Sequence, residues 1–309
     1  MGASAFFTGL ERRNGLLMNM KMLKEKLIKA GLFVCAAFSI VFVLSIIFYS
    51  LYNGNQAITA EFLHGFYWVP CIYFTVYVAV GAVALAVAIG LPCAIYMAEF
   101  ADMRLRNVTK TSLEVLDGFP SIVIGVLGWE LLSNPRSSYS FTHFLHHEFG
   151  MIGTGCLLFG WLILMVMSFP VIATISEDAL RAVSQDLREA SLGVGATKWQ
   201  TTTKVLLPSA MPRVLASILL ALAAAMGEVV ALWWVLGFTI PPVFSFSPLS
   251  AATSLSMIIN NQFQEANESG SPFLRQQVFA AAFVLFIVIG LVNIAIRIIV
   301  ANQSKRGAE

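Results

Sequence analysis

The chain has 309 residues, of which 58% are hydrophobic and only 12% are charged. A soluble domain of this size carries roughly 25% charged residues, so the composition excludes a soluble globular protein. A formal net charge of +2 gives no reason to expect a nucleic-acid partner. Because the apolar residues fall in blocks of 20 or more, we predict an all-α polytopic membrane protein with six transmembrane helices.

Three regions follow from this pattern. Residues 1–27 are predicted to form a polar cytoplasmic tail whose last part, Met20–Lys29, is a basic amphipathic helix at the membrane surface. Residues 28–300 form the transmembrane domain, which a cytoplasmic loop at 176–212 interrupts, and residues 301–309 form a second cytoplasmic tail. The first apolar stretch is too long for a signal peptide, so we expect it to remain as a membrane anchor.

The six apolar spans are predicted at about 28–51, 71–97, 112–132, 150–175, 214–238 and 277–300. Small residues in the second span favour close helix packing. We expect the third span to be broken at Asp117-Gly118-Phe119-Pro120, since proline interrupts a helix. Prolines in the long segment 239–276 argue against a continuous helix there, although Leu249–Gln262 is compatible with a helix on or in the membrane.

The lysines and arginines are sorted by side of the membrane. The N-terminal tail carries six of the 19, the connection between the second and third spans three, the loop before the fifth span five, and the C-terminal end three. Only Arg136 and Arg275 lie on the opposite side. This split of 17 to 2 predicts that both termini and the loop at 176–212 lie in the cytoplasm.

The polar stretch Arg181–Pro208 is the most informative part of the chain. Residues 178–192 lack glycine and proline and are predicted to form an amphipathic helix. Gly193 and Gly195 then permit a sharp bend with positive φ, and a second short helix runs from about Thr197 to Leu206, with Pro208 marking its end. Such a pair of helices is either a rigid knob that another protein grips or an ordinary linker between spans.

The spacing within this stretch resembles the cytoplasmic loop of bacterial ABC-importer permeases. That pattern is Glu-Ala-Ala, three residues, Gly, nine residues, Ile-x-Leu-Pro, and here Ser191 replaces the second Ala and Val205 replaces the Ile. The resemblance implies a loop that binds a separate ATPase through five residues: Glu189, Ala190, Gly195, Leu207 and Pro208.

Other stretches resemble the phosphate-specific branch of these permeases. Residues 93–128 are similar to its second and third spans, and residues 62–70 and 225–237 resemble the PstC-type subunit, whereas Glu-Asp-Ala-Leu-Arg-Ala-Val at 177–183 is closer to the sister PstA type. This resemblance implies the type I ABC-importer permease fold and a bacterial cytoplasmic-membrane location.

The resemblance also implies partners. These are a second permease subunit, either a different chain or another copy of this one, a cytoplasmic ATPase dimer and an extracytoplasmic phosphate-binding protein, all within membrane lipid. The chain has no Gly-x-x-x-x-Gly-Lys-Ser/Thr loop. ATP and Mg²⁺ are therefore expected on the ATPase, and neither an enzymatic activity nor a cofactor is expected on this chain.

Glu228 is predicted to lie deep in the fifth span. A carboxylate at mid-bilayer costs roughly 3 kcal/mol, so it should face a pathway or a partner helix. It is expected to be either protonated or paired with a base of the second permease, and the alternative is a structural hydrogen bond between helices. Related phosphate permeases carry an arginine one turn earlier, where this chain has Ala224.

Asp117, Pro120 and Ser121 form a second candidate group in the membrane. A proline break frees backbone N–H groups that can face an anion at the start of a half-helix, and Ser121 adds a hydroxyl donor. The alternative is a kink that only shapes the bundle. Asp117 does not suit a phosphate dianion unless it is paired or protonated.

Two other sets of residues are given structural roles. His143, His146, His147 and Glu148 have spacings compatible with metal ligands, but we expect an interfacial loop and no metal site. The four cysteines share no CxxC spacing and are predicted to be free, buried thiols.

The leading interpretation is a permease subunit of an ATP-driven phosphate importer. A permease for another oxyanion, such as molybdate, sulfate or phosphonate, remains open. A secondary transporter and a membrane scaffold without transport activity are alternatives of other classes.

Overall fold

The computed structural model describes residues 2–58, 68–137, 140–142, 144, 155–237 and 246–306. The chain divides into two compact units, residues 1–53 and residues 54–309, each of which is considered by itself. Within these ranges the regular structure is helical and contains no β-strand.

The first unit is one continuous helix, α1 (Gly2–Gly54). The predicted tail and first span are therefore not separate elements, because no proline between residues 2 and 54 removes a helical hydrogen bond. The part Lys24–Gly54 has a mean hydropathy of 2.7 over its most apolar window and is long enough to cross a membrane.

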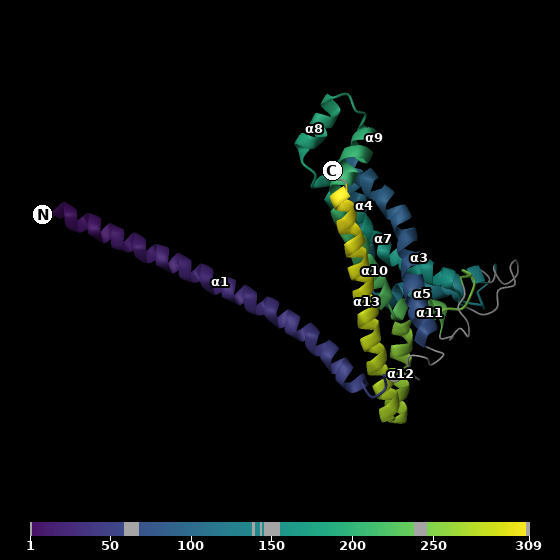
Figure 1. The fold of residues 1–309 in the computed structure, drawn as a ribbon. Coiled ribbons are helices and arrows are strands. Elements are labelled where there is room, and N and C mark those ends of the chain that lie inside the picture. Colours follow the sequence, from purple (N-terminus) through teal and green to yellow (C-terminus); the bar gives the residue numbers. More distant parts are fainter. Residues whose placement is uncertain are drawn as a thin grey trace. The chain divides into compact units, whose positions relative to one another are not determined.

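The second unit holds the other helices of the described residues (Figure 1). They are α3 (Trp68–Ile95), α4 (Met103–Asp117), α5 (Ser121–Gly128), α7 (Leu157–Arg181), α8 (Gln185–Gly193), α9 (Lys198–Thr201), α10 (Leu207–Gly227), α11 (Val230–Leu236), α12 (Leu255–Ser269) and α13 (Pro272–Arg306). Three π-helical segments extend them, at η1 (Tyr96–Phe100), η2 (Trp129–Ser133) and η3 (Thr202–Leu206).

Five helical stretches of the described chain can cross a membrane, and a sixth crossing is formed if the bent pair of α4 with α5 and η2 counts as one broken span. The six predicted spans are thus recovered with shifted ends. The predicted fifth span, Val214–Phe238, is wrong at both ends: the continuous helix runs from Lys198 to Gly227 and breaks at Glu228. The predicted helix at Leu249–Gln262 begins later, at Leu255.

The core lies between α3, α7, α10 and α11, where fully buried side chains such as Phe74, Phe159, Met226 and Leu232 meet. The small residues of α3 pack as expected: Ala82 is completely buried, and a Cβ atom at Gly81 would lie 2.2 Å from the Trp161 indole nitrogen. That nitrogen donates a hydrogen bond to the Tyr77 carbonyl at 3.2 Å.

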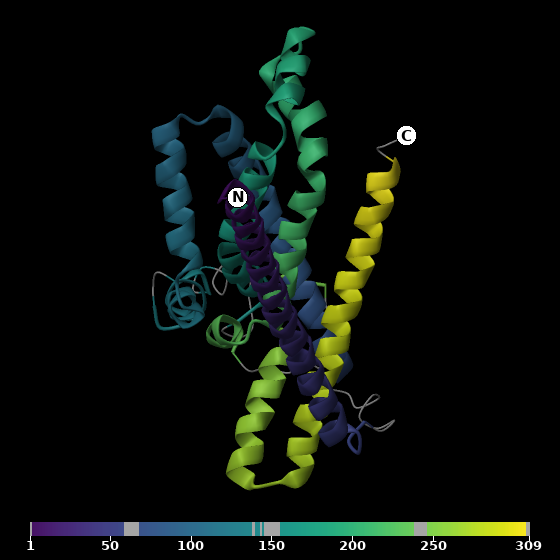
Figure 2. The ribbon, with the colours of Figure 1, turned by 90° about the vertical axis from the view of Figure 1, so that its left-hand side faces the viewer.

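The second unit has two distinct ends (Figures 1 and 2). In both views α8, α9 and the C-terminal end of α13 lie at one end, and α12 with the turn into α13 lies at the other. The basic loop and the basic C-terminal end are thus on one side of the unit, which agrees with the sorting of lysine and arginine seen in the sequence.

Candidate transport and coupling sites

The polar segment after α7 contains a break that the sequence did not predict. The expected single helix over 178–192 is wrong, because α7 continues to Arg181 and α8 begins only at Gln185. Ser184 adopts an extended backbone, with φ −56° and ψ 144°, at the N-cap of α8. Serine is favoured at that position, whereas neither glycine nor proline is needed to produce it.

The bend after α8 depends on one glycine rather than two. Gly195 has φ +87°, a conformation that side chains rarely adopt, as predicted. Gly193 is the last residue of α8 and does not have a positive φ. The amide of Gly195 bonds to the Leu192 carbonyl at 3.0 Å, so the glycine closes the C-terminal end of α8.

The second arm of the loop is continuous with the following membrane span. Thr197 and Gln200 form a reciprocal capping box at the start of α9, and the Ser191 and Thr201 hydroxyls, 3.0 Å apart, join α8 to this arm. The prediction that Pro208 ends the helix is wrong. Pro208 lies just after the π-helical segment η3, inside the helix that continues from Lys198 to Gly227.

Of the predicted coupling residues, Glu189 and Ala190 lie exposed on α8, and Pro208 is exposed at the start of α10, while Leu207 is half-buried. The structure adds an apolar set on the same knob, here defined as α8, α9 and their connection. Val194 is 86% exposed, and Leu187, Leu192 and Trp199 are also exposed. Large apolar side chains within a polar loop were the sequence signal that could have identified this set.

Two carboxylates at the base of the knob form ion pairs that the sequence analysis missed. Arg188 of α8 pairs with Glu99 of η1, and Glu177, which is fully buried near the end of α7, pairs with Arg106 and Lys110 of α4. Acidic residues at the ends of apolar spans were the available signal. The first pair attaches the knob to η1, which extends α3, and the pairs of Glu177 attach the end of α7 to α4.

The third span is broken as predicted. α4 ends at Asp117, α5 begins at Ser121 after Pro120, and the two helices meet at a bend of 90°. Asp117 and Pro120 are exposed in this subunit and Ser121 is half-buried.

A second break occurs at Glu228, where the sequence predicted a continuous helix. Glu228 has an extended backbone, with φ −69° and ψ 131°, and is partly exposed instead of deeply buried. Its Oε1 atom accepts a hydrogen bond from the Ala231 amide at 3.0 Å, so the carboxylate, one residue before the N-cap Val229, satisfies a free amide in the first turn of α11. Its own carbonyl accepts a bond from the Ser256 hydroxyl at 2.9 Å.

The two half-helices α5 and α11 run parallel and in close contact. A Cβ atom at Gly125 would lie 2.8 Å from the Ala231 Cα, and one at Gly128 would lie 3.0 Å from a Val235 methyl group. Since 125 pairs with 231 and 128 with 235, both helices advance in the same direction. Their N-terminal ends, with the breaks at 118–120 and 228–229, therefore lie at the same end of the pair.

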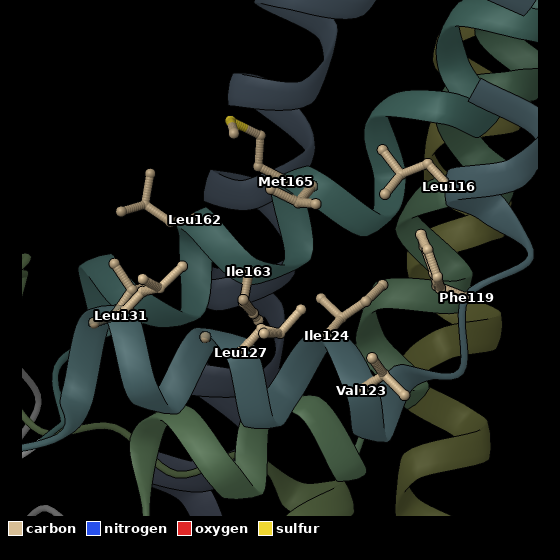
Figure 3. A pocket seen from close by; sticks show the side chains of 12 residues that line it. Leu116, Phe119, Val123, Ile124, Leu127, Leu131, Leu162, Ile163 and Met165 are labelled. Carbon is tan, nitrogen blue, oxygen red and sulfur yellow. The ribbon is translucent and has the colours of Figure 1, made fainter. Parts of the chain in front are cut away.

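A cavity of about 360 Å³ lies on the other side of α5, against α7 (Figure 3). Its lining side chains are apolar and include Phe119, Val123, Leu127, Leu131, Ile163 and Met165. A doubly charged oxyanion entering this cavity would lose its hydration without gaining a hydrogen-bond donor. The cavity is therefore not a candidate anion site.

The remaining residues singled out in the sequence are the histidine cluster and the cysteines. The histidine cluster at 143, 146 and 147, with Glu148, lies outside the described residues. Elsewhere in the described chain no group of three potential metal ligands occurs. The four cysteines are free, as predicted, but only Cys71 and Cys156 are buried, whereas Cys93 is half-buried and Cys35 is exposed.

Apolar crossing helices, a parallel pair of half-helices and a helical knob at one end define this chain as a membrane transport permease subunit. The chain belongs to the family described as binding-protein-dependent transport system inner membrane component, whose pattern matches residues 90–307. It is accordingly a multi-pass inner-membrane protein without catalytic activity of its own, and ATP hydrolysis in such systems belongs to a separate subunit.

Individual relatives agree with this assignment. The chain is 30% identical over 302 residues to the phosphate transport system permease protein PstC of Xylella fastidiosa (strain 9a5c), covering 90% of this chain and 91% of that protein. It is 31% identical over 252 residues to phosphate transport system permease protein PstA 1 of Mycobacterium tuberculosis (strain H37Rv), covering 80% and 73%.

Solved structures support the fold. A chain of a bacterial alginate ABC transporter, in complex with an alginate pentasaccharide-bound periplasmic protein, superimposes with a TM-score of 0.59. The match covers 92% of this chain and 95% of the other at 15% sequence identity. At this identity the similarity concerns the type I importer permease fold alone.

Proposed function

We propose that the chain is a permease subunit of an ATP-driven importer that moves inorganic phosphate across the cytoplasmic membrane. The observation that carries this proposal is the similarity, over nine-tenths of the chain, to a phosphate transport permease. The uncapped start of the half-helix α5 supports it, because free backbone N–H groups at a helix start suit an anion better than the apolar cavity does. Asp117, Pro120, Ser121 and Glu228 are proposed to line the pathway.

The proposed partners are a second permease subunit, a cytoplasmic ATPase dimer that binds ATP and Mg²⁺, and an extracytoplasmic phosphate-binding protein. The knob is proposed to contact the ATPase. Its exposed apolar residues, Val194 and Trp199 among them, suit a protein interface better than water. The cationic partner of Glu228, where it has one, is proposed to come from the second permease.

Another oxyanion is the second candidate substrate, because Ala224 occupies the position of the family arginine and is exposed on α10. Uptake of labelled phosphate by a strain that depends on this system decides between them. Excess molybdate, sulfate or phosphonate should not compete with phosphate. Competition by one of these anions at equal concentration would assign the permease to that anion.

Docking of the knob is tested at its two glycines. Gly195→Asp forces a side chain into a positive-φ position where the chain bends, so we expect uptake to fall at least tenfold while the subunit stays in the membrane. Gly193→Asp is the matched control, because Gly193 also has open space around it but no positive φ; it should retain more uptake. Normal transport by an inserted Gly195→Asp variant would contradict the coupling role.

Orientation is tested by single cysteines in a cysteine-free background. Asn55 and Asn267 are exposed in the structure, and so is Gln200 on the knob. With both termini and the knob in the cytoplasm, an impermeant thiol reagent added outside intact cells should label cysteines at 55 and 267 but not at 200. Labelling at 200 would reverse the proposed topology.

A further inference from the structure

Glu177 is a buried carboxylate that the proposed pathway and the docking surface do not use. Its side chain is 0% exposed, although it lies only four residues before the end of α7. Its Oε1 atom lies 2.6 Å from the Arg106 Nε, and its Oε2 atom lies 3.0 Å from the Lys110 Nζ. Arg181, one turn further along α7, approaches Oε1 at 3.7 Å.

Water cannot replace these partners. A buried carboxylate that loses its cations is left with an uncompensated charge, which is strongly unfavourable. The Arg106 and Lys110 side chains are themselves largely buried, at 16% and 23% exposure. The distance between the ends of α4 and α7 is therefore constrained by short charged hydrogen bonds that the protein cannot exchange for solvent contacts.

The position of Glu177 gives these bonds a mechanical consequence. Beyond it, α7 leads within a few residues to the knob, and α4 leads in its other direction to the break at 118–120 and the half-helix α5. A displacement of the knob that moves the end of α7 must pull on Arg106 and Lys110. Those two residues carry the displacement into α4 and so to the break.

We propose that Glu177 is a positioning residue that transmits movement of the knob to α4 and the break at 118–120. This inference rests on the proposed function, since it requires a knob that an ATPase moves. A purely structural carboxylate would affect the amount of assembled complex but not the number of anions moved per ATP hydrolysed.

The test uses the complete transporter, reconstituted in liposomes with its ATPase, second permease and binding protein. Phosphate uptake and ATP hydrolysis are measured in the same sample, per assembled complex. Glu177→Gln keeps the size of the side chain but removes the charge that holds both cations. We expect ATP hydrolysis within about twofold of the wild type and a fall of at least tenfold in phosphate moved per ATP.

Asp178→Asn is the matched control. Asp178 is the next residue, also pairs with Lys110 at 2.5 Å, and is 63% exposed. The Asp178→Asn variant removes one carboxylate from the same cluster but leaves the buried Glu177 carboxylate in place. The ratio of phosphate uptake to ATP hydrolysis should therefore stay within about twofold of the wild type. Equal losses in both variants would attribute the effect to local charge and overturn the assignment to Glu177.

If Glu177→Gln fails to assemble, Arg106→Gln and Lys110→Gln cut the same connection from α4 while Arg181 remains beside the carboxylate. We expect the same fall in the phosphate moved per ATP hydrolysed. The inference is overturned if an assembled Glu177→Gln complex keeps the wild-type ratio, or if both α4 variants keep it. If the phosphate-loaded binding protein does not stimulate ATP hydrolysis by the wild-type complex, the result contradicts the proposed function instead.

Discussion

The two breaks in the membrane-spanning helices are built differently. At 118–120 a proline interrupts the chain, and α5 begins without a side-chain cap. At 228–229 there is no proline, and the carboxylate of Glu228 accepts a hydrogen bond from the first turn of the helix that follows. The first break removes a backbone donor, whereas the second supplies a side-chain acceptor. The uncapped start of α5 leaves its N–H groups available to a ligand, whereas the start of α11 is stabilised by the single side chain of Glu228.

Substitution of Glu228 should therefore have the largest effect on this pair. Glu228→Ala removes the acceptor of the Ala231 amide and the acidic group at the break, at a cost of about 0.5–1.5 kcal/mol in stability, and we expect phosphate uptake to be abolished. Fractionation should still find the subunit in the membrane. Normal uptake by this variant would remove Glu228 from the pathway.

Glu228→Gln refines that result, because the amide oxygen can still accept the Ala231 hydrogen bond. Near-normal uptake would assign the effect of alanine to the lost acceptor or to a neutral donor, and loss of uptake would assign it to the negative charge.

The contact between the half-helices should give the next largest effect. Gly125→Ala places a methyl group 2.8 Å from the Ala231 Cα, so α5 and α11 must separate, at a cost of roughly 1–3 kcal/mol. The thermal unfolding temperature of the purified subunit should fall, and uptake with it. Gly118→Ala is the control, since its nearest neighbours would be at 3.5 Å. Equal unfolding temperatures for the two variants would refute the close contact.

Asp117 should give the smallest effect. It is exposed at the end of α4, and Pro120 rather than Asp117 is the N-cap residue of α5. We expect Asp117→Asn to leave membrane insertion unchanged and to change uptake by less than about threefold. A loss comparable to that of Glu228→Ala would show that both breaks require an acidic group and that the difference between their helix starts is secondary.

Proline and glycine account for much of what the sequence predicted. The break at Pro120 and the bend at Gly195 follow from backbone chemistry that belongs to single residues. The break at Glu228 does not, because any run of Ala, Met, Gly and Val is compatible with a continuous helix. It depends on the Ala231 amide and on Ser256, a residue 28 positions away, and such long-range contacts are not visible in local sequence.

The ion pairs also could not be predicted from local sequence. Glu177 and Arg106 are 71 residues apart in sequence and 2.6 Å apart in the structure. The count of charges by side predicted which loops share an end of the molecule, but it treats each charge as a point in solvent. Which carboxylate is buried, and which cations surround it, depends on the packing of α4 against α7.

The π-helical segment Thr202–Leu206 joins the second arm of the knob to the membrane-spanning part of the helix. A π turn holds one residue more than an α turn, and each residue of an α-helix turns the chain by about 100°. Deletion of a single residue in this segment would let the helix return to α geometry while α10 kept its place. The knob would then keep close to its present direction, because an α turn completes nearly the same rotation with one residue fewer. A one-residue deletion is thus absorbed at this turn, whereas the same deletion within the α-helical part of α10 would rotate the knob by about 100° about the helix axis.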